Sequence, residues 1–168
     1  MDIVIEGRAW VFGDNINTDI ISPPQYLELS IADSSRYAMS AVRPEFATLV
    51  RPGDILVAGA NLGSGSSRET SPLTLRHLGI RAIIAQSFAR IFYRNCINLG
   101  LPALECVECG RIGDGSRVRV EIGRGVIVDG TRNEIYRFVP LPTNIMDMIE
   151  AGGLIPYLKG LRQAAHQE

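Results

Sequence analysis

The chain has 168 residues, about the size of one domain, with 46% hydrophobic and 21% charged residues. Its net charge of −1 argues against the overall basic field of a nucleic-acid-binding protein. The longest stretch without a charged residue, 55–67, ends in glycine and serine and is shorter than the about 20 apolar residues that span a membrane. No basic segment followed by an apolar run opens the chain, so we expect no secretory signal and a cytoplasmic protein.

The first third of the chain combines one strand with a polar turn. Apolar residues predict a strand over 3–12, and the following run 13–19 (Gly-Asp-Asn-Ile-Asn-Thr-Asp) is rich in turn formers and carboxylates. Two prolines, at 23 and 24, keep the next segment extended. We expect a short helix over 33–39, with Asp33 or Ser34 as its cap.

The middle of the chain alternates strands and helices. The predicted elements are a strand at 55–58, a helix at 70–78, a strand at 82–85, a helix at 88–99 capped by Ser87, and a strand at 101–106. The strands are unbroken apolar runs, which is typical of strands buried on both faces. This order predicts a parallel sheet.

The last third has a different pattern. Its predicted elements are a hairpin of strands 117–122 and 126–129, a strand at 134–139, a helix at 143–151 capped by Thr143, a helix at 154–162, and a frayed tail at 163–168. Gly152 and Gly153 end the first of these helices. No segment resembles a linker, so we expect one mixed α/β domain over residues 1–168.

The three cysteines do not form a recognisable metal site. Cys106 and Cys109 have the spacing of two metal ligands, but a structural zinc site needs four ligands. Cys96 is an odd third thiol. We expect plain reduced thiols and no metal bound by this chain.

The segment that carries chemistry is 63–69 (Gly-Ser-Gly-Ser-Ser-Arg-Glu), between a predicted strand and a predicted helix. Its glycines allow a ligand to approach the backbone, and the helix start offers unpaired N–H groups. Ser66 and Ser67 add hydroxyls, and Arg68 adds a fork for a carboxylate or phosphate. The alternative is a glycine-rich turn with a serine as helix cap. Neither GxGxxG nor the P-loop pattern is present, which argues against nucleotide binding.

Three ordered motifs together resemble a known family. They are Gly-Asp-Asn-Ile-Asn-Thr-Asp-Ile-Ile at 13–21, Gly-Ser-Gly-Ser-Ser-Arg-Glu at 63–69 and Ser-Phe-Ala-Arg-Ile-Phe-Tyr-Arg-Asn at 87–95. Gly-Leu-Pro at 100–102 and Ala-Gly-Gly-Leu at 151–154 also fit. Over nearly its whole length the chain resembles the small, swivelling domain of the aconitase superfamily, and within it the small subunits of 3-isopropylmalate dehydratase.

This resemblance implies a β/β/α swivelling fold and a hydro-lyase that moves a hydroxyl between adjacent carbons of a small hydroxy-dicarboxylic acid. It implies a large-subunit partner that carries a [4Fe-4S] cluster, whose iron acts as Lewis acid on the departing hydroxyl, while this chain binds no cofactor. By the same resemblance Ser66 is the general base, and Ser67 and Arg68 hold a substrate carboxylate.

Other polar residues allow two interpretations. Asp14, Thr18 and Asp19 either orient the site or cap turns, and Asn61 either supports the active loop or forms a turn. Arg90 lies either near the site or interface, or on a solvated helix face.

One segment departs from the family pattern. After Tyr26 and Leu27, members that act on isopropylmalate or homocitrate-type acids commonly carry a basic residue, whereas this chain has Glu28 followed by Leu29 and Ser30. Glu28 would repel a carboxylate placed near it, and the leucines favour an apolar side group.

The sequence therefore predicts a hydro-lyase small subunit, with isopropylmalate as the default substrate. A related dehydratase of the dimethylmalate or homoaconitase type is the first alternative, and a stand-alone anion-binding module is the second. A homo-oligomer of the isolated chain also remains open.

Overall fold

The computed structural model describes residues 2–66 and 68–167. In this part of the chain, seven strands form one mixed sheet in the order β4-β3-β2-β1-β5-β6-β7. The strands are β1 (Val4–Val11), β2 (Ile55–Ala58), β3 (Ala82–Ala85), β4 (Ala103–Glu105), β5 (Arg117–Glu121), β6 (Val126–Asp129) and β7 (Glu134–Arg137). Strands β1 to β4 run parallel, and β5, β6 and β7 continue from β1 in antiparallel order. The predicted mixed α/β class is confirmed.

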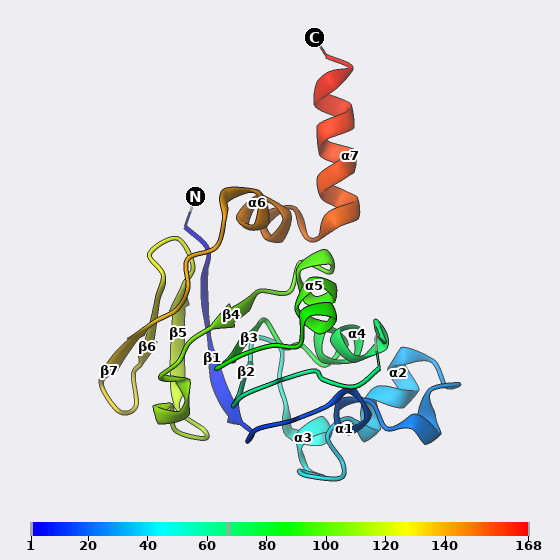
Figure 1. Cartoon of the computed structure of the whole chain (residues 1–168), viewed down its shortest axis with the longest axis vertical. Coiled ribbons are helices and arrows are strands. Elements are labelled where there is room, and N and C mark those ends of the chain that lie inside the picture. The colour runs from blue at the N-terminus through cyan, green and yellow to red at the C-terminus, as the bar shows by residue number, and fades with distance from the viewer. Residues whose placement is uncertain (1, 67, 168) are drawn as a thin grey trace.

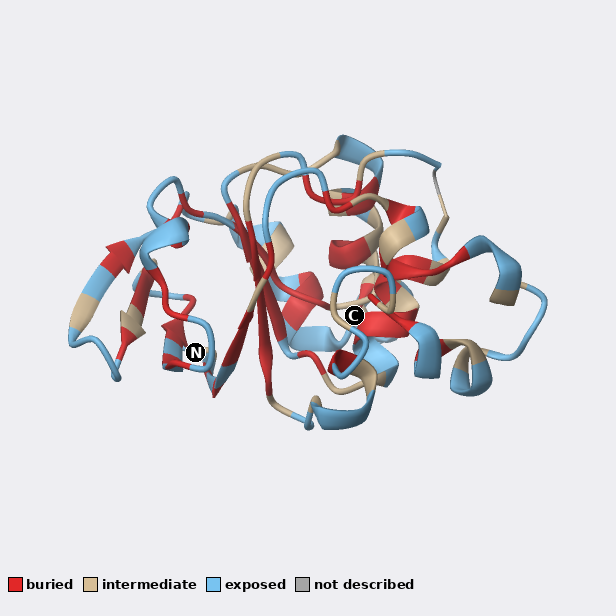
Figure 2. Cartoon of the chain, turned by 90° about the horizontal axis from the view of Figure 1, so that it is seen from below, coloured by how far each residue is buried: buried red, intermediate tan, exposed pale blue. Residues whose placement is uncertain are grey.

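Helices cover one face of the sheet, and β5 to β7 curl over the other (Figures 1 and 2). The helices are α1 (Thr18–Ile21), α2 (Ile31–Ser34), α3 (Phe46–Leu49), α4 (Thr70–His77), α5 (Arg90–Asn98), α6 (Thr143–Ala151) and α7 (Leu154–Ala165), with single 3₁₀ turns at Pro24–Tyr26, Ser35–Tyr37 and Cys109–Arg111. A hydrogen bond of 2.9 Å from Val139 N to Glu105 O joins the segment after β7 to β4, so the two ends of the curled sheet approach each other.

The parallel strands bury both faces. Leu56 and Ala58 of β2 pack into the core under the helices, while Ile55 and Val57 pack into a second core enclosed by β5 to β7. Strand β3 divides its residues between the two cores in the same way. The unbroken apolar runs at 55–58 and 82–85 follow from this arrangement, because neither face meets water.

Three predicted helix caps are wrong. In place of the predicted helix 33–39, residues 31–37 form α2 and a 3₁₀ turn, and Ser30 caps α2 by accepting a hydrogen bond of 3.1 Å from Asp33 N. Ser87 does not cap α5, because its hydroxyl accepts from Asn61 N instead. Helix α6 begins without a side-chain cap at Thr143. Ser87 and Thr143 both lie near a helix start, but neither side chain makes the capping hydrogen bond. For Ser87 the reason is the competing contact with Asn61 N.

The C-terminal part turns sharply before it leaves the body. Gly152 and Gly153 end α6 with φ of 93° and 130°, conformations that favour glycine. Helix α7 then projects away from the rest of the molecule (Figure 1). It continues to Ala165, so the residues 163–165 that were expected to fray are helical. Within the described residues, no helix is long and apolar enough to cross a membrane.

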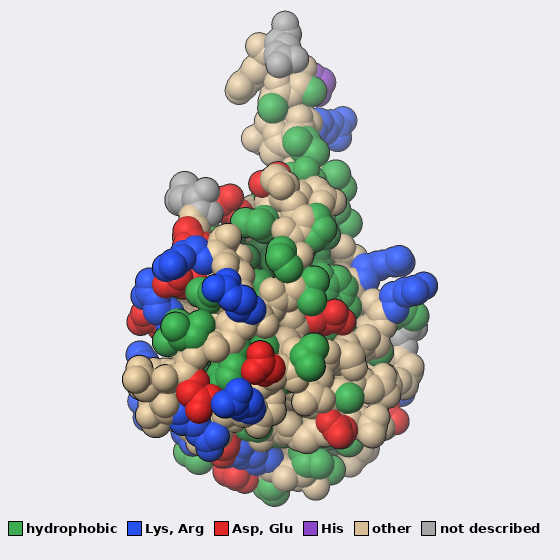
Figure 3. Space-filling view, turned by 60° about the vertical axis from the view of Figure 1, so that its left-hand side comes forward, with side chains coloured by type: hydrophobic (Ala, Val, Ile, Leu, Met, Phe, Trp, Pro, Cys, Tyr) green, Lys and Arg blue, Asp and Glu red, His purple; other side chains and the backbone are tan. Residues whose placement is uncertain are grey.

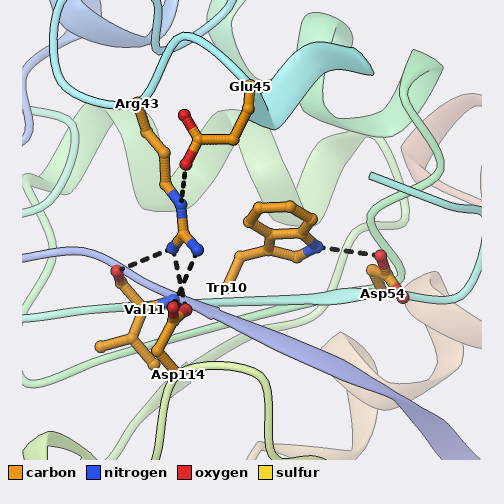
Figure 4. A network of polar contacts seen from close by, with 6 residues as sticks. All are labelled: Trp10, Val11, Arg43, Glu45, Asp54 and Asp114. Atoms are coloured by element: carbon orange, nitrogen blue, oxygen red, sulfur yellow. Dashed lines mark hydrogen bonds and ion pairs between the residues drawn. The ribbon is translucent and has the colours of Figure 1, made fainter. Parts of the chain in front are cut away.

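A polar network holds the carboxyl end of β1 in place (Figure 4). Arg43 binds Asp114 through two hydrogen bonds of 2.8 Å, and Asp114 also accepts from Val11 N at 3.0 Å. The Arg43 guanidinium lies 4.5 Å from the ring centroid of Trp10, whose indole N–H donates to Asp54 at 2.9 Å. The Arg43 hydrogen bonds hold the pKa of Asp114 below its usual value. The network thus positions the loop that follows β1.

Candidate active site

Two polar loops lie side by side at the carboxyl ends of β1 and β2. The first, residues 13–19, follows β1 and includes the first two residues of α1, and the second, residues 59–66 together with Arg68, follows β2. Backbone hydrogen bonds of 2.8–2.9 Å join them, from Asn15 N to Ala60 O, from Gly63 N to Ile16 O and from Thr18 N to Ser64 O. Because β1 and β2 are parallel neighbours, two motifs far apart in the sequence form one surface.

Two glycines in the second loop are required by its geometry. Gly63 has φ of 84°, and a Cβ there would overlap the Phe92 ring. Gly65 has φ of 104°, and its Cβ would lie 3.1 Å from the Thr18 hydroxyl. These glycines let the loop approach α1 and α5 closely, which brings the following serine next to Thr18.

Ser66 is exposed, and its Oγ lies 3.3 Å from the Oγ1 of Thr18. Thr18 is 2% exposed, and three hydrogen bonds hold its backbone, since its N donates to Ser64 O and its carbonyl accepts from Ser22 N and from Ser71 Oγ. The Ser66 hydroxyl therefore faces solvent on one side and a rigid hydroxyl on the other.

Arg68 points back to the first loop. Its guanidinium forms an ion pair of 3.0 Å with Asp19, which lies in the first turn of α1. Both side chains remain partly exposed, at 31% and 56%. A guanidinium has five N–H donors, so one contact with Asp19 orients the group and leaves donors for a carboxylate. Asp19 thus positions Arg68.

Asp14 and Asn61 have local structural contacts. Asp14 Oδ1 accepts from Ala60 N at 2.8 Å, which favours the turn-capping interpretation. Asn61 has φ of 59°, and its side chain donates to Asn15 Oδ1 at 3.2 Å, so it forms the turn and links the two loops. Neither residue has a described contact with Ser66.

The predicted specificity segment packs beside α4. Tyr26 stacks on Tyr37 with ring centroids 3.7 Å apart, and Glu28 and Ser30 are exposed. Leu27 and Leu29 line a small cavity of about 40 Å³ together with Ser22, Pro23, Ile31, Ser34, Thr70 and Thr74. The cavity thus joins this segment to the first turns of α4, which begins two residues after Arg68.

Comparison with known proteins identifies the family. The profile of the aconitase C-terminal domain matches residues 21–108. The 3-isopropylmalate dehydratase small subunit of Nautilia profundicola is 47% identical over 157 residues, covering 93% of this chain and 95% of the relative. The chain belongs to the family of 3-isopropylmalate dehydratase small subunits.

Further relatives agree with this assignment. The isopropylmalate/citramalate isomerase small subunit of Methanocaldococcus jannaschii is 45% identical, covering 95% of this chain and 96% of the relative. The methanogen homoaconitase small subunit of Methanothermobacter thermautotrophicus is 47% identical, covering 95% of this chain and 94% of the relative. The crystal structure of a 3-isopropylmalate dehydratase from M. jannaschii matches with a TM-score of 0.93 and 36% identity, covering 98% of this chain and 99% of the other. The expected aconitase-type fold and the role as a hydro-lyase small subunit are thus confirmed.

Two predicted site residues of this small subunit have no described contact with Ser66. Ser67 lies outside the described residues. Arg90 is exposed at the start of α5 and lines a separate hollow of about 460 Å³, with Phe88, Tyr93, Ala103, Glu105 and residues 139–142. The structure brings together Ser66, Thr18, Arg68 and Asp19, and it does not bring Glu28 or Arg90 into hydrogen-bond contact with the described residues among them.

Thr70 is a residue that sequence reasoning missed. Its hydroxyl is buried and has no hydrogen-bond partner among the described residues, and it borders the small cavity beside Leu27 and Leu29. Thr70 and Thr74 are four residues apart and therefore share one face of α4. That spacing, directly after the Ser-Arg-Glu run, was the available signal.

The three thiols of this small subunit are buried in the two cores and have no described contact with Ser66. Cys96 lies in the core under the helices, and Cys106 and Cys109 lie in the core enclosed by β5 to β7. Burial raises the pKa of the Cys109 thiol to about 12, and the thiol donates to Ala58 O at 3.3 Å. Among residues 2–66 and 68–167, no three Cys, His, Asp or Glu side chains gather where they could hold a metal ion.

Proposed function

We propose that this chain, in complex with a large subunit, converts 2-isopropylmalate into 3-isopropylmalate by dehydration and rehydration, a step of leucine biosynthesis in the cytoplasm. The observation that carries the proposal is the placement of the Ser66 hydroxyl against Thr18, with Arg68 oriented by Asp19 on the same surface. A base and a carboxylate anchor are the two groups that such a reaction needs from this side of the substrate.

Ser66 acts as the general base. As an alkoxide, its Oγ removes the proton from the carbon next to a substrate carboxylate, while the hydroxyl leaves from the neighbouring carbon. In the second half of the reaction, water adds its hydroxyl to the carbon that lost the proton. Ser66 then returns a proton to the carbon that lost the hydroxyl, so that the net change is an exchange of the hydroxyl and hydrogen positions.

A serine alkoxide needs stabilisation, because the hydroxyl is a weak acid and a weak base at neutral pH. Thr18 Oγ1, at 3.3 Å, donates a hydrogen bond to it, and the Arg68 guanidinium adds positive charge nearby. Arg68 also binds the substrate carboxylate through the donors that Asp19 does not occupy. Ser67 supplies a further hydroxyl to that carboxylate.

The large subunit supplies the [4Fe-4S] cluster, and its iron acts as Lewis acid on the departing hydroxyl. The three thiols of this chain do not fit a cluster, since they are divided between two buried cores. The open Ser66 surface, with Asp19 56% exposed, suits a site that a partner covers.

The substrate's distinguishing group lies toward the Leu27–Leu29 cavity in this proposal. The relatives named for isopropylmalate, citramalate and homoaconitate chemistry have similar identities of 45–47%, so identity alone does not select a substrate. Leu27 and Leu29 favour an apolar branch, and the exposed Glu28 disfavours a third carboxylate. Dimethylmalate, which has a smaller apolar branch, is the nearest competitor.

The test is an assay of the purified chain with and without its large subunit and an anaerobically rebuilt cluster. We expect turnover of 2-isopropylmalate only in the complex. Substantial turnover by the isolated chain would contradict the proposal, and so would a loaded complex that is active only on tricarboxylic acids.

A further inference from the structure

The hydroxyl of Thr70 differs from the other buried polar groups of this small subunit. Within residues 2–66 and 68–167, its Oγ1 is the one buried side-chain polar atom without a hydrogen-bond partner. Thr70 begins α4, and it borders the cavity of about 40 Å³ beside Leu27 and Leu29. A buried hydroxyl without a partner is unfavourable, because it has lost its hydrogen bonds to water. The position of Thr70 therefore points to a polar occupant of the cavity.

Charged side chains on the outside of the sheet have partners within the chain. Figure 3 shows Lys or Arg side chains interspersed with Asp or Glu side chains on the side of the molecule formed by β5 to β7. Arg119 of β5 forms ion pairs with Glu6 and Glu121, and Arg124 also pairs with Glu121. These opposite charges compensate one another, whereas the Thr70 hydroxyl has no such partner among the described residues.

The cavity has one apolar wall and one wall of hydroxyl groups. The apolar wall is formed by Pro23, Leu27, Leu29 and Ile31, and the hydroxyl wall by Ser22, Ser34, Thr70 and Thr74. Leu29 is 46% exposed, so the apolar wall reaches the surface, whereas Ser22 and Thr74 are buried. The hydroxyl wall is therefore the inner end of the cavity.

The volume and the hydroxyls of this cavity fit a bound water molecule. A cavity needs about 10–15 Å³ to hold one water, and a buried water makes about two to four hydrogen bonds. The cavity of about 40 Å³ is large enough. The Ser22 hydroxyl donates to Thr74 Oγ1 at 3.4 Å, so its own lone pairs remain able to accept. A water in the cavity can therefore bond to Thr70 and to a second hydroxyl of the same wall.

The hydroxyl wall is connected to the turn that carries Ser66. Ser22 N donates to the carbonyl of Thr18 at 2.8 Å, and Ser71 Oγ of α4 donates to the same carbonyl at 3.3 Å. The Thr18 hydroxyl in turn lies 3.3 Å from Ser66 Oγ. Figure 1 shows α1, α2 and α4 side by side. The residue that contacts Ser66 is thus held by the same segments that form the inner wall of the cavity.

We propose that Thr70 is a specificity-determining residue, whose hydroxyl holds a water at the inner end of the cavity and so limits the length of the apolar branch that the cavity accepts. This inference rests on the proposed function, in which the substrate's distinguishing group lies toward Leu27 and Leu29. A short branch contacts the apolar wall and leaves the water in place. A longer apolar branch displaces the water and leaves the Thr70 hydroxyl unpaired, which lowers affinity.

The first test compares 2-isopropylmalate with 2-isobutylmalate, whose branch is one methylene longer, in the complex reconstituted with the large subunit. Thr70→Val keeps the shape of the side chain and removes the hydroxyl. It should raise kcat/KM for the longer substrate relative to the shorter one at least about tenfold, because no hydroxyl is then left unpaired. The change should lie in KM, with kcat for 2-isopropylmalate within about threefold of wild type, because the water acts on binding.

Two controls separate the hydroxyl from other effects of the substitution. Thr70→Ser keeps the hydroxyl and should keep the wild-type ratio. Thr48→Val makes the same chemical change at an exposed residue of α3 and should leave the ratio unchanged. Turnover by Thr70→Val with an unchanged ratio would overturn this inference alone. Absence of turnover of both substrates by the wild-type complex would refute the proposed function and this inference with it.

The second test needs no turnover and uses the isolated full chain. Crystal structures should show a water within hydrogen-bond distance of Thr70 Oγ1 in the wild type and no water there in Thr70→Val. The Tm of Thr70→Val should equal that of the wild type or lie below it, because the water already pairs the hydroxyl. A dry cavity in the wild type, or a higher Tm in Thr70→Val, would overturn the inference, since the hydroxyl would then be unpaired. Failure of Thr70→Val to fold would overturn it as well, because the hydroxyl would then serve the fold and not substrate selection.

Discussion

The hydroxyl of Thr18 is the most specific structural contribution to the proposed base, and Thr18→Val removes it while keeping the shape of the side chain. The hydroxyl's described contact is the 3.3 Å approach to Ser66 Oγ. A hydrogen bond between neutral groups contributes about 1 kcal/mol, and one to a charged oxygen about 1.5–3 kcal/mol. If Ser66 works as an alkoxide, the variant loses the larger amount in the transition state. We therefore expect kcat to fall about 10- to 150-fold.

Stability should respond differently from activity in this variant. Ser66 is exposed, so water replaces the lost partner, and the free energy of unfolding should change by less than about 1 kcal/mol. The matched control is Thr18→Ser, which keeps the hydroxyl and should retain kcat within a few-fold.

The assay is steady-state conversion of 2-isopropylmalate by the reconstituted complex, with chemical denaturation of each variant in parallel. A Thr18→Val enzyme with kcat within threefold of wild type would refute the reasoning. Equal losses in Thr18→Val and Thr18→Ser would refute it as well, because packing rather than the hydroxyl would then matter.

Three further changes test other parts of the account. Arg68→Lys should lower kcat/KM about 10- to 100-fold, because an ammonium cannot hold Asp19 and a carboxylate with one planar fork; normal steady-state kinetics would remove Arg68 from substrate binding. Glu28→Arg should raise kcat/KM for a tricarboxylate relative to isopropylmalate at least about tenfold, and an unchanged ratio would place Glu28 away from the substrate. Asp114→Asn should lower the free energy of unfolding by about 1 kcal/mol at neutral pH. The pKa of Asp114 is lowered in the folded state, so its stabilisation is present above the unfolded value near 3.8 and is lost as pH falls through the folded value. Denaturation of both proteins from pH 7 to 2 should therefore show their difference disappearing below about pH 3.8, and a constant difference would contradict the ion-pair explanation.

The pattern of apolar residues in the sequence predicted most accurately the strands that are buried on both faces. The strands at 55–58 and 82–85 have the predicted bounds, because an apolar run buried on both faces ends where polar residues begin. Helix caps were predicted poorly, because a polar residue near a helix start is a cap only if its side chain reaches a free backbone N–H group of the first turn. Ser87 stands near α5, but the neighbouring loop brings Asn61 N to its hydroxyl instead.

The candidate site was predictable where it is local in the sequence. The Gly-Ser-Gly-Ser-Ser-Arg run predicted Ser66 and Arg68 as candidate residues without any structure. Their partners were not predictable in this detail, since Thr18 and Asp19 lie nearly fifty residues earlier. Their contacts depend on β1 lying beside β2 in one register and on Gly65 allowing close approach. Thr70 was missed because its unpartnered hydroxyl is visible only once α4 is packed.

The central claim is that Ser66 is the base, and kcat of Ser66→Ala in the reconstituted complex tests it most directly. Ser64→Ala is the matched control, because it changes a serine of the same loop whose described hydrogen bond is made by its backbone carbonyl. We predict that Ser66→Ala lowers kcat at least about 10²- to 10⁴-fold with normal folding and large-subunit binding, while Ser64→Ala stays near wild type. A Ser66→Ala complex with near-normal kcat would contradict the account.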